Sequence, residues 1–165
     1  MVSMLPFSTV VFAPLFGIMV DKIGKGTRWM MVGAILALVA HLLLAFAPAG
    51  VPFYGYLSMV FLGFGYSLVP AAMWPSVPKL VPAKVLGTAY ALTYWVQNLG
   101  LMLFKMFAGN ILAAKSSDAA TSNAAGAVGV EIMFVSVCIL ALLLAIGLRR
   151  SSANRPELHL DTPST

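Results

Sequence analysis

Residues 29–47 read WMMVGAILALVAHLLLAFA, and this stretch decides the fold class. It contains no Asp, Glu, Lys or Arg in 19 residues. An α-helix rises about 1.5 Å per residue, so a helix of this length crosses nearly all of a hydrocarbon layer about 30 Å thick. Hydrocarbon offers no water to backbone N–H and C=O groups, and a single segment pairs all of them only as a helix. Residues 29–47 therefore predict a transmembrane helix.

Four further apolar stretches occupy residues 2–20, 53–74, 85–112 and 130–148. Of the 165 residues, 61% are hydrophobic and 9% are charged, with a mean hydropathy of +0.95. A water-soluble domain carries about 25% charged residues, so this composition excludes one. We predict an all-α membrane protein with about five transmembrane helices. The single cysteine, Cys138, lies inside an apolar stretch, which excludes a disulfide within the chain.

The basic residues lie between the apolar stretches rather than on one face, so the net charge of +5 does not indicate a nucleic-acid partner. They are frequent in residues 21–28, in residues 75–84 and from residue 149 onward. Residues 48–52 have none and residues 113–129 have one. Because cytoplasmic loops are rich in Lys and Arg, this alternation predicts an outer N-terminus and a cytoplasmic C-terminus. We predict a transmembrane bundle over 1–150, a flexible connection over 113–129 and a disordered cytoplasmic tail over 151–165.

Residues 17–28, GIMVDKIGKGTR, form the most informative local motif. An ordinary cytoplasmic loop explains its basic residues but not its G-x-x-x-D-K-x-G-K spacing. A glycine one turn before the helix end permits a close approach of helices. The motif resembles the signature loop of the major facilitator superfamily, in the copy between helices 8 and 9. The residues that carry this gating motif are Gly17, Asp21, Lys22, Gly24, Lys25 and Arg28.

This resemblance implies that the chain corresponds to helices 8–12 of a twelve-helix fold, which is most of the C-terminal six-helix bundle. Its partners would then be the lipid bilayer, a small-molecule solute and the missing N-terminal half of the same transporter. In the family, the signature Asp is thought to lie near a helix N-terminus in the opposite half, where the helix dipole favours an anion. The resemblance gives that role to Asp21.

Residues 72–90, AMWPSVPKLVPAKVLGTAY, and residues 96–101, VQNLGL, carry a narrower resemblance. They are similar to the lysosomal dipeptide transporter subgroup of the superfamily and its bacterial relatives. This likeness implies transport of small organic solutes, plausibly dipeptides, in a bacterial cell membrane or, as the alternative, a lysosomal membrane. The three prolines at 75, 78 and 82 predict an extended linker before a helix restarts near residue 85.

The helix that follows carries polar and aromatic residues at three- and four-residue spacing, so they share one face. A polar stripe on a membrane helix faces protein or a water-filled cavity. Alternatively, these residues form hydrogen bonds to a neighbouring helix. Lys105 either reaches the outer interface or attracts a carboxylate. With Tyr66, on the helix that lines the cavity in the family it resembles, the predicted substrate-binding residues are Tyr90, Tyr94, Gln97 and Asn98.

Other polar residues predict structural roles. A hydrogen-bonded structural role for His41 is favoured over proton coupling, Glu131 is expected to open the last helix, and Trp74 is expected to anchor at the headgroups. No carboxylate lies at the centre of a predicted span, which favours uniport or facilitated transport. No metal cluster, cofactor motif or nucleophile–base arrangement is visible, so an enzyme is not predicted. The leading hypothesis is a secondary transporter working by alternating access, and the alternative is a self-contained five-helix scaffold or regulatory protein.

Overall fold

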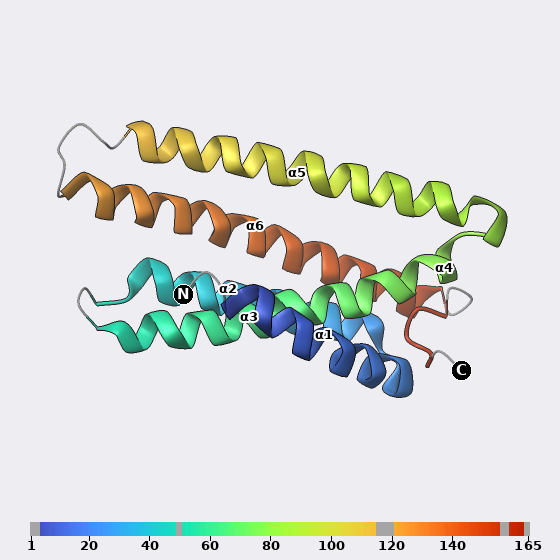
Figure 1. Ribbon diagram of the computed structural model, residues 1–165. Helices are drawn as coiled ribbons and strands as arrows, with labels where there is room; N and C mark the ends of the chain where they lie inside the picture. The colour runs from blue at the N-terminus through green and yellow to red at the C-terminus, as the bar shows by residue number, and fades with distance from the viewer. Residues whose placement is uncertain (1–3, 49–50, 115–120, 156–158, 164–165) are drawn as a thin grey trace.

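The computed structural model describes residues 4–48, 51–114, 121–155 and 159–163, and all regular secondary structure in these ranges is helical (Figure 1). Five long helices account for most of the chain. Short helical turns connect the third long helix to the next one. The elements in chain order are α1 (Met4–Ile23), α2 (Gly26–Phe46), α3 (Pro52–Met73), η1 (Trp74–Ser76), α4 (Val77–Leu80), η2 (Ala83–Val85), α5 (Leu86–Ala114) and α6 (Thr121–Asn154).

Four segments of the described chain are long and apolar enough to cross a membrane. They are residues 26–46, 52–80, 83–114 and 125–154, and α1 is the remaining long helix with 20 residues. The 21 residues of α2 correspond to about 31 Å, close to the thickness of the hydrocarbon layer. The predicted fold class, an all-α membrane protein, is confirmed: about five transmembrane helices were predicted, and the described chain has five long helices, four of them candidate spans.

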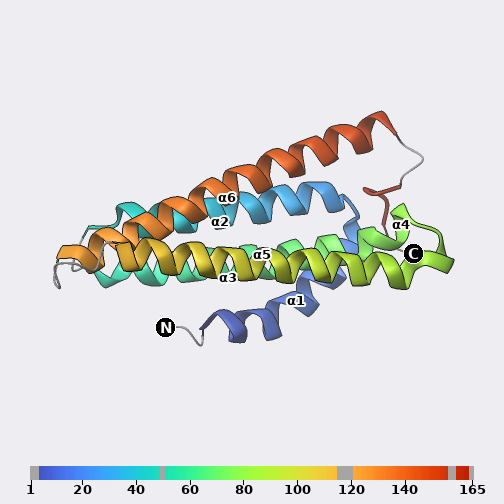
Figure 2. The same ribbon diagram turned by 90° about the horizontal axis from the view of Figure 1, so that it is seen from above.

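The helices form two parts that meet along α6. α3 packs against both α1 and α2, and α6 packs on α2 and lies between this group and α5 (Figures 1 and 2). α2 and α3 cross closely because glycines face each other there: a Cβ on Gly65 would lie 2.8 Å from the carbonyl oxygen of Gly33. Gly65 therefore permits the tight packing of α3 on α2. Its partner Gly33 had not been identified from the sequence.

α5 is the least enclosed helix of the described chain. It packs mainly along α6 and touches α4 and η2 at its start, and none of its residues is buried. In a water-soluble protein such a helix would be unstable. In lipid its apolar side chains need no protein cover, because hydrocarbon is as apolar as a protein interior.

The connection between α5 and α6 is shorter than expected. α5 continues to Ala114 and α6 already begins at Thr121, so the flexible connection expected over 113–129 is wrong for residues 121–129. Residues 115–120 lie outside the described chain. Glu131 consequently lies about three turns inside α6, so the expectation that it opens this helix is wrong.

The linker with three prolines is mostly helical, contrary to the prediction. Pro75 lies in the first turn of η1 and Pro78 in the first turn of α4, where a helix needs no backbone donor from them. The chain is extended only at Val81 and Pro82, with ψ angles of 146° and 148°. Proline is unfavourable in a helix interior, where it removes a hydrogen bond, but it is well suited to the first turn.

The tail also differs from the disorder predicted for 151–165. α6 extends to Asn154, and residues 159–163 fold back against the turn between α1 and α2. Leu160 is 2% exposed. The α1–α2 turn, α4 and residues 159–163 thus gather at one end of the bundle, which we call the loop end (Figure 1).

Candidate functional site

The signature loop forms a tight turn between two helices. Only Gly24 and Lys25 separate the end of α1 from the start of α2, and both have left-handed backbones, with φ of 69° and 58°. The N–H of Gly24 donates to the carbonyl oxygen of Val20 at 2.8 Å, which closes the last turn of α1. Glycine adopts this conformation freely, whereas it costs a residue such as Lys25 about 1 kcal/mol or more.

The other motif residues surround this turn. Asp21 is half-buried and has no hydrogen bond or ion pair with the described residues. The side chains of Lys22, Lys25 and Arg28 are exposed. No described atom lies within 4 Å of a Cβ built on Gly17, so the close helix approach predicted for this glycine is not made by the described chain.

The strongest contacts of the loop come from residues that the sequence did not point to. The carboxylate of Asp161 accepts hydrogen bonds from the N–H of Thr27 at 3.0 Å and from its hydroxyl at 2.8 Å. The backbone oxygen of Asp161 accepts from the N–H of Lys25 at 2.8 Å. These residues are 134 positions apart, and no local pattern connects them.

The polar stripe on α5 is exposed over most of its length. Gln97 and Asn98 are exposed, and Tyr94 is 54% exposed. The side-chain N–H of Asn98 donates to the carbonyl oxygen of Tyr94 at 2.8 Å within the same helix. In the described chain, neither amide bonds to a neighbouring helix. The structural alternative for these two residues therefore has no support there.

The tyrosines of the stripe pack on a residue that we expected at the headgroups. The ring of Trp74 stacks on Tyr94 with centroids 4.7 Å apart and lies 5.6 Å from Tyr90. The hydroxyl of Tyr90 also donates to the carbonyl oxygen of Trp74 at 3.4 Å. Trp74 thus joins the end of α3 to the start of α5. Tyr66, 60% exposed, has no ring contact or hydrogen bond with this group.

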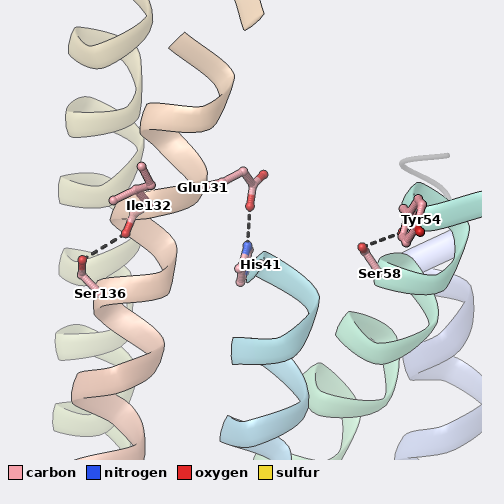
Figure 3. A network of polar contacts seen from close by, with 6 residues as sticks. All are labelled: His41, Tyr54, Ser58, Glu131, Ile132 and Ser136. Carbon is pink, nitrogen blue, oxygen red and sulfur yellow. Dashed lines mark hydrogen bonds and ion pairs between the residues drawn. The ribbon is translucent and has the colours of Figure 1, made fainter. Parts of the chain in front are cut away.

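His41 and Glu131 form a polar pair between α2 and α6 (Figure 3). The Nδ1 atom of His41 lies 2.7 Å from a carboxylate oxygen of Glu131, and the side chains are 12% and 22% exposed. The imidazole also stacks on Phe134 with centroids 5.0 Å apart. The hydrogen-bonded role predicted for His41 is confirmed, and Glu131 is its partner.

A cavity of about 430 Å³ lies between α2, α3, α4 and α6. Its lining is almost entirely apolar and includes Met30, Met73, Cys138, Leu148 and Leu160. None of the predicted substrate-binding residues contributes to it. Among the described residues, no group of three or more His, Cys, Asp or Glu side chains is placed to hold a metal ion.

Comparison with known proteins gives one family. Residues 1–164 match the sequence profile of the Major Facilitator Superfamily. The chain is 38% identical over 135 residues to the lysosomal dipeptide transporter MFSD1 of Mus musculus, and 36% identical to that of Danio rerio. The Homo sapiens protein of the same name is 35% identical over 134 residues. Each alignment covers 81% of this chain but only 26% of the relative, so the chain spans about a quarter of these relatives' length.

Proposed function

The chain belongs to the major facilitator superfamily, and from this premise we propose that it forms part of a transporter that moves dipeptides across a membrane by alternating access. Membership in a family of multi-pass membrane transporters also agrees with the prediction that the protein is not an enzyme. The substrate class is supported by the relatives, which are named as dipeptide transporters and are 34–38% identical to this chain. We propose transport by uniport or facilitated transport.

The exposed stripe on α5 is the observation that carries the proposal. The amides of Gln97 and Asn98 hold unused donors and acceptors, and a dipeptide presents an amide, an ammonium and a carboxylate. The ring of Tyr94 offers a face to the ammonium group. A membrane helix rarely carries such groups toward lipid, so we propose that this face lines the solute pathway. Tyr66 would then line the same pathway from α3.

The rest of the pathway would come from other helices of a twelve-helix fold. In that arrangement, Asp21 would meet a helix N-terminus of the opposite half, because it has no ionic partner in the described chain. We also propose that the loop end faces the cytoplasm. The basic segments at residues 21–28 and 75–84 and the tail all gather there, and Lys79 donates to the backbone oxygen of Thr162 at 2.7 Å.

The membrane itself is a further proposal. The resemblance implied a bacterial cell membrane, with a lysosomal membrane as the alternative, and the relatives are named as lysosomal proteins. Imaging of the tagged protein in the cell that encodes it distinguishes a cell-surface membrane from an internal one.

Uptake of labelled dipeptides into vesicles that contain the protein encoded by its complete gene tests the function. Saturable uptake is expected, and Asn98→Ala should raise the half-saturating concentration about tenfold, because one lost hydrogen bond costs about 1.4 kcal/mol. Asn110→Ala is the matched control, because Asn110 lies on the same helix but about 120° around its axis from Asn98, away from the stripe. Absence of saturable uptake for every dipeptide would contradict the substrate assignment. An equal effect of both variants would contradict the stripe.

A further inference from the structure

The first turn of α2 is capped by the distant tail rather than by the residue that precedes the helix. Lys25, the residue before the helix, makes no side-chain capping bond. The exposed N–H groups of a helix start need acceptors, and a carboxylate is the favoured one. Asp161 supplies both its carboxylate, to Thr27, and its backbone oxygen, to Lys25.

Two further contacts fasten the same segment. The ammonium group of Lys79 donates to the backbone oxygen of Thr162 at 2.7 Å, which joins the tail to α4. The hydroxyl of Ser152 lies 3.5 Å from the Asp161 carboxylate, at the end of α6. Residues 159–163 are therefore tied to α2, α4 and α6 at once.

Leu160 gives the segment an apolar anchor. It is 2% exposed and lines the 430 Å³ cavity together with Met30, Met73 and Leu148. Because the neighbouring Asp161 and Thr162 bond to the loop and to α4, Leu160 is held against the loop end of the cavity, which stays open elsewhere. A leucine in this place keeps the polar groups of the loop apart from an apolar space.

The tail also restricts which residue fits at Gly24 of the signature loop. A Cβ on Gly24 would lie 2.6 Å from the backbone oxygen of Asp161 and 2.8 Å from the nitrogen of Pro163. Gly24 thus has a second requirement besides its left-handed backbone, namely room for the tail. The backbone of the tail therefore leaves no room for a side chain at position 24.

We propose that residues 159–163 act as a releasable strap that holds the signature loop in place and closes the loop end of the apolar cavity between α2, α3, α4 and α6. Closed, the strap makes the loop ends of α2, α4 and α6 one unit. Released, it uncaps the first turn of α2 and opens the cavity to water. This inference does not rest on the proposed transport function, because it concerns contacts within the described chain.

Hydrogen–deuterium exchange of the purified protein tests the strap at the amides that bond to it. Asp161→Ala should raise the exchange rates of the Lys25 and Thr27 amides at least tenfold. Arg155→Ala is the control, because Arg155 is exposed and makes no contact with the loop. Unchanged exchange in a folded Asp161→Ala protein would overturn the proposal.

Thiol labelling tests the cavity. Cys138 lines the cavity and is half-buried. A positively charged methanethiosulfonate reagent does not cross lipid, so it reaches Cys138 only through water. We expect Leu160→Ser to raise the labelling rate at least fivefold relative to Arg155→Ala, in a background without other cysteines. Equal labelling would overturn the closing role of Leu160.

Thr27→Val, which keeps its N–H but loses the hydroxyl donor, should increase the labelling rate of Cys138 less than Asp161→Ala. The reverse order would overturn the role of the carboxylate.

Discussion

The contact between His41 and Glu131 predicts a measurable coupling energy between α2 and α6. Replacing His41 by Phe keeps a ring to stack on Phe134 but removes the Nδ1 atom that faces Glu131. Replacing Glu131 by Met removes the carboxylate. Each single change leaves the other polar group without the partner that the structure gives it. The double change removes both groups together.

The size of the coupling follows from the burial and length of the contact. Hydrogen bonds between membrane helices average about 0.6 kcal/mol and reach about 1.7 kcal/mol. This contact is short, at 2.7 Å, and its side chains are only 12% and 22% exposed, so water screens it little. A bond to an ionised group is roughly twice as strong as a neutral one. We therefore expect a coupling of about 1–2 kcal/mol.

A double-mutant cycle measures this energy. The free energy of unfolding of the four proteins is obtained in mixed detergent micelles by titration with dodecyl sulfate, followed by circular dichroism. Each single variant should lose about 1–3 kcal/mol, and the double variant should lose less than their sum. Glu131→Gln serves as the control, because it keeps an acceptor of the same shape and separates charge from hydrogen bonding. A coupling within about 0.5 kcal/mol of zero would refute the interpretation of the pair as a link between the two helices.

Three further substitutions have defined outcomes. Gly24→Ala should lower the free energy of unfolding by about 2 kcal/mol, because of the left-handed backbone and the clash with the tail. Gly17→Ala is the control: its Cβ meets no atom, so it should be neutral or slightly stabilising. Equal losses of unfolding free energy in micelles would contradict this. Gly65→Ala should cost about 1–3 kcal/mol, because its Cβ meets backbone, and Gly55→Ala should not, as thermal unfolding can check. Tyr94→Leu removes the stacking of Tyr94 on Trp74, so the fluorescence of Trp74 should be quenched less. An unchanged emission spectrum would count against the contact.

Much of the fold was predictable from the sequence, because hydrocarbon imposes one strong rule. Residues 29–47 had to be helical once they were placed in lipid, and the same rule holds for the other apolar stretches. Boundaries were less predictable. The helical residues 121–129 are mostly small, with polar side chains only at 121–123, and such a composition does not separate a helix end from a loop.

The candidate site divides in the same way. The shared face of Tyr94, Gln97 and Asn98 follows from helical spacing, which the sequence carries directly. Their packing on Trp74 does not, because it depends on where the turn after α3 sends the chain. The substrate-binding role of these residues stays a prediction.

What the sequence determined by itself is therefore the solvent, the helices, the family and the faces of single helices. These depend on composition and on spacing within about one turn. The pairing of His41 with Glu131 and the capping of α2 by Asp161 were decided only by the tertiary structure. The physical reason is distance along the chain: these contacts join residues 90 and 134 positions apart, and each polar group has many partners that would satisfy it equally well. Only the packing of the helices selects one of them.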